Sequence, residues 1–180
     1  LETYRRAERQ NAGITNLLVM GPWAHGDWGS KDGDKLGNVK FHAKTAAFYR
    51  EHIELPFFRQ FLKGATNDPL PEAYIFVTGL NQWRRFDAWP PRTVRERTLY
   101  FHPGGHLAFT PPTDGAPAFD EYVSDPAKPV PFRARPIQPM GYDSGLTWSY
   151  WLVDDQREAS GRPDVLTYVS ITCTSKLALS

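Results

Sequence analysis

The sequence predicts a mostly β protein in two regions, a helix–strand–helix segment over residues 1–65 and a jelly-roll-like β-sandwich over residues 66–180. Two observations support this division. The apolar run at 17–20 has no polar alternation and ends at the breaker Gly21-Pro22, which is typical of a strand buried on both faces of a parallel sheet. Further along, short segments rich in β-forming residues recur between proline-rich connections, at the spacing of a sandwich.

The first region begins with a predicted helix over residues 2–11, a polar stretch that is rich in arginine and contains neither glycine nor proline. Gly13 ends this helix, and a strand is predicted over residues 14–20. Residues 26–42 have the glycine-rich and aspartate-rich composition of a loop. A helix followed by a strand and then a loop is typical of an α/β unit.

A second helical stretch is predicted over residues 44–54, and Pro56 interrupts its pattern because proline has no backbone N–H to donate. The apolar pattern then resumes and ends at Gly64, a predicted C-cap. Two short helices or one kinked helix fit this pattern. The resumed segment places three aromatic side chains on one apolar face: Phe57, Phe58 and Phe61.

The second region follows a predicted linker over residues 65–71, which contains Asn67-Asp68-Pro69. The strands predicted beyond it cover residues 73–79, 83–86, 97–101, 107–109, 121–123, 148–153 and 165–170. Long connections rich in proline separate these strands, and no helix is predicted among them. This pattern favours a Greek-key or jelly-roll sandwich.

Composition narrows the function classes. Hydrophobic residues make up 41% of the chain and charged residues 23%, which is typical of a globular protein. The net charge of +1 and the lack of any charge block exclude a nucleic-acid or membrane-surface partner. The single cysteine, Cys173, excludes an internal disulfide. The aromatic content of 14% suits a sandwich core or a pocket for an apolar acyl group equally well.

The candidate catalytic residue is His25, which lies on the predicted loop directly after the first strand. Open α/β sheets place their chemistry at the carboxyl ends of their strands, and imidazole is the side chain most often used to move a proton near neutral pH. By its position alone, however, a histidine after a strand is more often structural than catalytic. Trp28, three residues further on, would either line an acyl pocket or pin the loop down.

The sequence predicts no metal and no cofactor. Asp32, Asp34 and Gly37 give a weak impression of a calcium loop, but they lack the later glutamate and the regular ligand spacing of such loops. Three other histidines are expected to be solvated surface or turn residues without a third ligand nearby: His52, His102 and His106.

Beyond these patterns, the sequence resembles the CocE/NonD serine hydrolases, a family of esterases, acylases and X-Pro dipeptidyl-peptidases of the S15 class. The similar blocks follow the family's order along most of the chain, at residues 21–26, 49–58, 83–91, 99–101, 121–126 and 162–166. The first of them, Gly-Pro-Trp-Ala-His-Gly, is similar to the family's segment around the catalytic histidine. Within the family, the likeness is greatest to α-amino acid ester hydrolases and glutaryl-7-aminocephalosporanic acid acylases.

The resemblance implies that residues 1–65 are the C-terminal remnant of an α/β-hydrolase domain. It implies that residues 66–180 are part of a galactose-binding-like jelly roll, similar to the C-terminal domain of X-Pro dipeptidyl-peptidases. It also implies that His25 is the general base of a triad whose serine and aspartate would precede residue 1. No G-x-S-x-G elbow occurs in the sequence, so we expect the isolated chain to be inactive. Residues 171–180 depart from the family pattern, as a truncation or a frame shift would produce.

The implied substrate of the full-length enzyme is a small acyl ester, amide or peptide. Because strands would be missing at both ends of the chain, we also expect open sheet edges and self-association. The alternative hypothesis is a non-catalytic β-sandwich module that binds carbohydrate or protein. Such a module would not need a buried strand followed by His25, and this feature favours the hydrolase.

Overall fold

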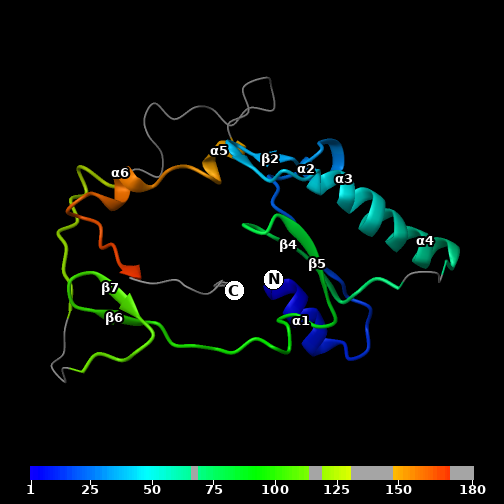
Figure 1. Ribbon diagram of the computed structural model, residues 1–180, viewed down its shortest axis with the longest axis horizontal. Coiled ribbons are helices and arrows are strands. Elements are labelled where there is room, and N and C mark those ends of the chain that lie inside the picture. The colour runs from blue at the N-terminus through cyan, green and yellow to red at the C-terminus, as the bar shows by residue number, and fades with distance from the viewer. Residues whose placement is uncertain (66–68, 114–118, 131–147, 171–180) are drawn as a thin grey trace. The chain divides into compact units, whose positions relative to one another are not determined.

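The computed structural model describes residues 1–65, 69–113, 119–130 and 148–170 (Figure 1). The chain divides into two compact units, the first from Leu1–Val94 with Gln138–Asp154, the second from Arg95–Ile137 with Asp155–Ser180. The described residues form small sheets with few helices, in agreement with a mostly β chain. No helix in these described ranges is long and apolar enough to cross a membrane.

The first unit is built on a three-stranded sheet and a neighbouring helix: β1 (Leu18–Met20), β4 (Ala73–Val77), β5 (Gln82–Phe86) and α1 (Glu2–Gln10). β1 pairs in parallel with β4, with Leu18 opposite Ala73, and β4 pairs antiparallel with β5. Figure 1 shows β4 and β5 side by side, with α1 close to them. The parallel pairing predicted for the first apolar run is confirmed.

The compact units therefore divide after Val94, whereas the predicted domain boundary follows residue 65. The reason is the pairing of β1 with β4, which carries the first sheet across that boundary. The assignment of residues 1–65 and 66–180 to two domains of the family stays a prediction.

β1 is shorter and more exposed than predicted. Leu18 is buried, but Met20 is 47% exposed. In the described part of the chain, β1 has one neighbouring strand, β4, and forms an edge of the sheet. The prediction of a strand buried on both faces is therefore wrong for these residues, because no further strand or helix of the described chain covers the second side of Met20.

α1 packs on the sheet through Tyr4, which is buried in one cluster with Leu18 and Ala73. The Tyr4 hydroxyl donates a short hydrogen bond to the Glu72 carboxylate, at the start of β4. Burial, together with the neighbouring Glu72 carboxylate, raises the pKa of the Tyr4 hydroxyl above its ordinary value. The predicted helix over residues 2–11 is thus confirmed. Tyr4 packs α1 against the sheet and also links it to β4 through Glu72.

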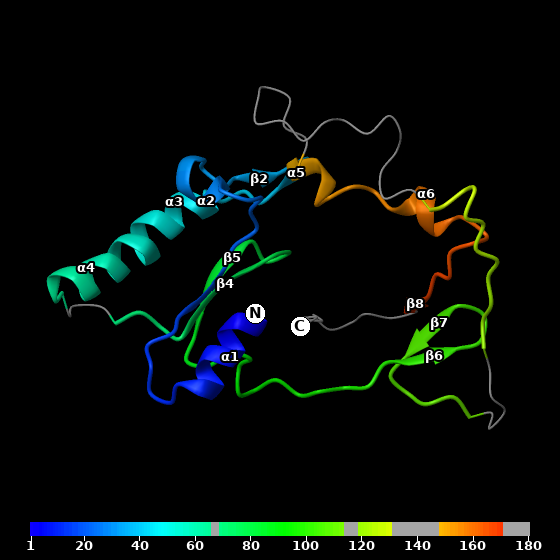
Figure 2. The same cartoon turned by 180° about the vertical axis from the view of Figure 1, so that it is seen from behind.

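The second helical stretch is a single rod with a π-helical segment in its middle: α3 (Thr45–Tyr49), η1 (Arg50–Glu54) and α4 (Leu55–Lys63). Figure 2 shows α3 continuing directly into α4. The π-helical segment ends just before Pro56, where an α-helix would lose a hydrogen bond and clash with the preceding turn. Gly64 ends the rod at φ +65°, as its predicted role as a C-cap requires.

The apolar face of α4 lies largely open. Three of its large side chains are 46–75% exposed: Phe58, Phe61 and Leu62. The ring of Phe57 contacts those of Phe58 and Phe61, so the aromatic residues pack mainly against one another. The predicted apolar face is present, but no described element covers these three side chains.

The second unit contains a sheet of three short strands and a helical turn: β6 (Tyr100–His102), β7 (His106–Ala108), β8 (Val169–Ser170) and α6 (Arg157–Ser160). β6 and β7 form an antiparallel hairpin, and β8 runs parallel to β7. The hairpin turns at Gly104-Gly105, both with positive φ. A Cβ at Gly105 would lie 2.9 Å from the carbonyl oxygen of Thr167, so this approach of β8 to the turn requires glycine.

Two strand predictions in this part of the chain are wrong, and a third holds only in part. Residues 121–123 form no strand, and residues 148–151 form the short helix α5 (Trp148–Trp151). Of residues 165–170, only Val169-Ser170 pair as a strand. β propensity acts through pairing with a neighbouring strand, and in the described chain residues 121–123, 148–151 and 165–168 have no such partner. Residues 171–180, which include Cys173, lie outside the described residues. The same is true of residues 66–68, at the centre of the predicted linker.

Candidate active site

His25 lies on a tight turn beyond the carboxyl end of β1. The chain leaves the sheet at Gly21-Pro22, and the short helix α2 (Asp27–Ser30) begins two residues after His25. Gly26 makes the turn at φ +83°, a conformation that favours glycine. Ala24 is buried beneath the turn and His25 is exposed. The structure thus places His25 on the loop where the sequence predicts it. We call residues 23–28 the histidine turn.

Trp23 fixes the entry to the histidine turn. Its indole ring lies so close to Gly21 that a Cβ there would fall 2.4 Å from it. The indole Nε1 of Trp23 donates to the Thr45 Oγ1 at 2.8 Å, and this hydroxyl donates to the Gly33 carbonyl at 2.6 Å. Thr45 is completely buried. The hydroxyl is therefore both acceptor and donor, and it joins three segments that are distant in sequence.

The structure brings the two predicted site residues together. The rings of His25 and Trp28 lie 5.7 Å apart between centroids and are nearly perpendicular, at 84°. Trp28 also contacts Trp23, with centroids 6.4 Å apart. Trp28 is 37% exposed, so part of its indole is available for contact with another molecule while the rest holds the turn.

Arg50 holds the far end of the histidine turn. Its Nη1 donates to the carbonyls of Trp28 and Lys31, each at 2.8 Å. Both carbonyls lie at the end of α2, where helix geometry leaves such groups without a partner in the helix. The ammonium of Lys31 also pairs with Asp27 at 2.9 Å. The turn is thus tied to the helical rod at both of its ends.

An aromatic cluster lies behind the histidine turn. Trp23 contacts Tyr49 and Trp83, with centroids 5.2 and 5.7 Å apart, and Phe48 stacks on Trp83 at 14°. The Trp83 Nε1 is buried without a hydrogen-bond partner among the described residues. This cluster joins the rod to β5 and gives the turn a rigid support.

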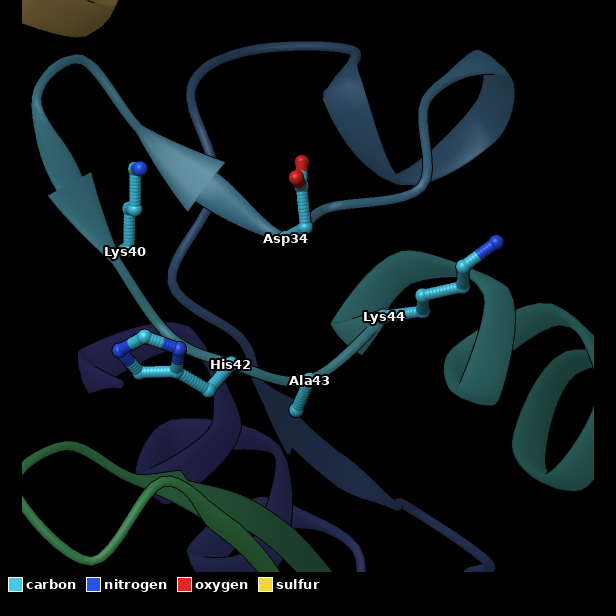
Figure 3. A pocket seen from close by; sticks show the side chains of 5 residues that line it. All are labelled: Asp34, Lys40, His42, Ala43 and Lys44. Atoms are coloured by element: carbon cyan, nitrogen blue, oxygen red, sulfur yellow. The ribbon is translucent and has the colours of Figure 1, made fainter.

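Residues 26–42, predicted as a loop, contain α2 and a small antiparallel hairpin of β2 (Lys35–Leu36) and β3 (Val39–Lys40). An open pocket of about 240 Å³ lies beside this hairpin, lined by Asp34, Lys40, His42, Ala43 and Lys44 (Figure 3). Lys44 pairs with Asp32 at 3.0 Å, and its side chain extends away from His42 in Figure 3. His25 does not line this pocket, nor a second one beside β5 at residues 71–72, 85–87 and 91–93.

The three other histidines considered in the sequence lie on other elements. His52 lies on η1 with its ring 4.6 Å from that of Phe48. His102 and His106 face each other across the β6–β7 hairpin, and the His102 Nε2 lies 2.9 Å from the Thr110 carbonyl oxygen. Over the residues that are described, no three histidine, cysteine, aspartate or glutamate side chains gather as metal ligands would.

Sequence reasoning missed Thr45, Arg50 and Trp83. A threonine and an arginine on a helix carry no signal by themselves, and their partners lie about twenty residues upstream in the chain. Trp83 falls in a segment similar to the family, but nothing in its spacing indicates a contact with Trp23.

Comparison with known proteins adds to this geometry. No protein-family model matches the chain. The chain is 28% identical over 176 residues to cocaine esterase from Rhodococcus sp. (strain MB1 Bresler), which covers 91% of this chain and 28% of that protein. The chain therefore spans less than a third of this curated relative.

Two solved structures superpose on the chain with a TM-score of 0.79 each. One is an aminopeptidase from the marine sediment archaeon Thaumarchaeota archaeon, 40% identical over 92% of this chain and 26% of that one. The other is an α-amino acid ester hydrolase labelled with selenomethionine, 42% identical over 93% of this chain and 28% of that one. These relatives are all hydrolases, in agreement with the resemblance of the sequence blocks. The comparisons therefore support the resemblance of this chain to one part of the CocE/NonD-like hydrolases.

Proposed function

We propose that this chain is the C-terminal part of a serine hydrolase and that His25 is the general base of its catalytic triad. The observation that carries the proposal is the place of His25, on a tight turn beyond the carboxyl end of a parallel strand and beside Trp28. Active sites of open α/β sheets lie at this end of the strands. The likeness to hydrolases over more than nine-tenths of the chain supports the same reaction class.

In this proposal, the serine and the aspartate come from a part of the longer protein outside these 180 residues. As the serine oxygen attacks the substrate carbonyl carbon, the His25 imidazole takes the hydroxyl proton. The tetrahedral intermediate collapses, the C–O or C–N bond breaks, and His25 gives the proton to the leaving alcohol or amine. A water then attacks the acyl-enzyme, with His25 again as the base; the bond between the acyl carbon and the serine oxygen breaks, and His25 returns the proton to that oxygen. The chain itself supplies the base and the support that orients it.

We assign Trp28 to the acyl side of the substrate site. Its indole contacts His25 on one side and is partly exposed, so an acyl group held for attack beside His25 would lie within its reach. This supports a small ester, amide or peptide with an apolar acyl group as substrate. The proposal includes no metal, cofactor, nucleic-acid or membrane partner.

We further propose that the β6–β7–β8 sheet is part of a jelly roll like the C-terminal domain of X-Pro dipeptidyl-peptidases. The antiparallel β6–β7 hairpin and the similar blocks at residues 99–101, 121–126 and 162–166 support this assignment. In the same proposal, α1, β1 and the helical rod are the last elements of an α/β-hydrolase domain, whose remaining strands would continue the sheet at the open edge of β1.

The test is hydrolysis of a p-nitrophenyl ester by the longer protein with single histidine substitutions. We expect His25→Ala to lower kcat about 10⁴-fold or more, as loss of a triad histidine does. His52→Ala is the matched control, because His52 also contacts an aromatic ring and lies on the rod. We expect the control to keep kcat within about twofold, since surface substitutions have small effects. A His25→Ala protein with near-normal kcat would refute the proposed function.

A further inference from the structure

We propose that Thr45 and Arg50 are positioning residues that fix the orientation of the His25 ring from opposite ends of the histidine turn. This inference rests on the proposed role of His25. It concerns two side chains of the helical rod whose hydrogen bonds go to Trp23 and Gly33, and to Trp28 and Lys31.

The first route runs through side chains. Thr45 Oγ1 accepts the hydrogen bond of the Trp23 indole, and the Trp23 ring contacts Trp28, which meets His25 edge to face. Since Thr45 is completely buried, its hydroxyl has no water to replace a lost partner. The orientation of the Trp23 ring therefore determines the surface against which Trp28 and His25 pack.

The Thr45 hydroxyl is itself held by the Gly33 turn. A Cβ at Gly33 would fall 2.6 Å from Thr45 Oγ1 and 2.5 Å from the Ala46 nitrogen, and Gly33 has φ +72°. The carbonyl of Asp32 accepts the backbone N–H groups of Ala46 and Ala47 at 3.0 and 3.3 Å. This turn therefore supplies hydrogen-bond acceptors for the first backbone N–H groups of α3. It also fixes the position of the Thr45 hydroxyl that accepts the Trp23 hydrogen bond.

The second route runs through the backbone. One Arg50 nitrogen donates to the carbonyl of Trp28, within α2, and to that of Lys31, directly after α2. Arg50 is the first residue of the π-helical segment, and such segments recur at functional sites because they redirect a side chain from the regular helix surface. Arg50 thus fixes the backbone of Trp28, and Thr45 acts on the indole ring of Trp28 through Trp23.

Together, the two routes explain how an exposed turn can hold a base in place. A general base must stay within hydrogen-bond reach of the proton that it takes, and an error of about 1 Å can lower the rate about 100-fold. His25 lies between Trp23 and Trp28, so the two contacts restrain the turn on both sides of it.

The first experiment uses the 180-residue chain with ¹³Cε1-labelled histidine. The chemical shift of the His25 Cε1–H signal is measured in each protein. The value in the Trp28→Leu variant is subtracted from it, and the difference is the ring-current shift that Trp28 causes. We expect Thr45→Val to remove about half of this difference or more, and Thr45→Ser to keep it because the hydroxyl remains. Thr167→Val is the matched control, since Thr167 Oγ1 also donates to a carbonyl, that of Ser160, at 3.0 Å. If Thr45→Val does not fold, Thr45→Ala takes its place.

Arg50 is tested in the same way. We expect Arg50→Gln to reduce the shift difference and Arg85→Gln to leave it unchanged, because Arg85 donates instead to the Pro69 carbonyl at 3.1 Å. A folded Thr45→Val or Thr45→Ala protein with the full shift difference would overturn the route through Trp23. A folded Arg50→Gln protein with the full difference would overturn the route through the backbone.

The second experiment measures kinetics in the longer protein. We expect Thr45→Val to lower kcat about 10- to 100-fold with little change in KM, and Thr45→Ser to restore it. Loss of activity in His25→Ala together with a normal kcat in Thr45→Val would overturn this inference and leave the proposed function intact. Full activity in His25→Ala would instead refute the proposed function, and the signal of His25 would still report whether Thr45 orients it.

Discussion

The two compact units hold their histidines in different ways. In the described chain, every residue of the buried core belongs to the first unit, including Thr45, Phe41 and Tyr74. The described residues of the second unit contribute no side chain to this buried core, and Phe101 and Val123 are 66% and 83% exposed. A turn backed by a packed core can fix the direction of a side chain, whereas a turn backed by a short hairpin fixes mainly its own backbone.

The histidine turn and the β6–β7 hairpin make this difference concrete. Both place a histidine beside glycines with positive φ. His25 lies on a turn tied to the rod by a buried threonine and an arginine, with an aromatic cluster behind it. His102 and His106 lie on paired strands joined by the three-residue turn Pro103-Gly104-Gly105, where the contacts are backbone hydrogen bonds and one bond to a carbonyl. Histidines beside similar glycine turns therefore have different structural support.

The largest expected effect concerns activity of the chain by itself. We expect the isolated 180 residues to hydrolyse p-nitrophenyl esters no faster than their own His25→Ala variant, because the chain has no G-x-S-x-G nucleophile. Relative to the longer protein, the rate would be lower by about 10⁴-fold or more, at least as much as for His25→Ala, because the serine and the aspartate are absent. Clear turnover that disappears in His25→Ala would mean that another residue of the chain is the nucleophile. It would contradict the proposal that the serine lies outside these 180 residues.

The next effect concerns association. We predict that the isolated chain binds a second copy through α4 and the edge of β1, because Phe58 and Leu62 are 50% and 75% exposed and Met20 is 47% exposed. Burial of a few hundred Å² of apolar surface contributes several kcal/mol at about 25 cal/mol per Å². Sedimentation at micromolar concentration measures the mass.

Substitution of this face tests its part in the association. Phe58→Lys with Leu62→Lys should shift the chain toward the mass of one copy, whereas Val94→Lys, at a residue that is 55% exposed outside α4, should not. A wild-type chain that sediments as a monomer and melts cooperatively would contradict the predicted association through α4 and β1.

The smallest effect concerns pH. The raised pKa of Tyr4 means that its stabilising contribution is complete below the ordinary value of 10.0 and is lost as pH rises above it. We expect the free energy of unfolding of the wild type to fall by about 1 kcal/mol more than that of Tyr4→Phe between pH 10 and pH 11. Denaturant titrations at these two pH values measure the difference. Parallel losses in both proteins would show that the contact between Tyr4 and Glu72 does not persist in solution.

Much of the first unit could be predicted because its signals are local. A polar stretch without glycine gave α1, the breaker Gly21-Pro22 ended β1, and Gly64 ended the helical rod. The same local signals placed His25 on a loop and Trp28 beside it. Each of these features depends on backbone chemistry within a few residues, which a sequence displays directly.

The remainder depends on contacts between distant segments. The bond from Trp23 to Thr45 crosses 22 residues, and the pairing of Leu18 with Ala73 crosses more than fifty. Nothing local distinguishes Thr45 from any other threonine at the start of a helix. For the same reason, the aromatic segment at residues 148–151 was predicted as a strand, although it forms a helical turn where no strand pairs with it.

The most direct test of the account is the acylation step itself, measured by stopped-flow release of p-nitrophenol from the longer protein. His25→Gln keeps a polar side chain of similar length on the turn but cannot take a proton near neutral pH. We expect the rapid first release to disappear in His25→Gln and to persist in His102→Gln, on the hairpin of the second unit. A rapid first release that survives in His25→Gln would contradict the claim that His25 is the base.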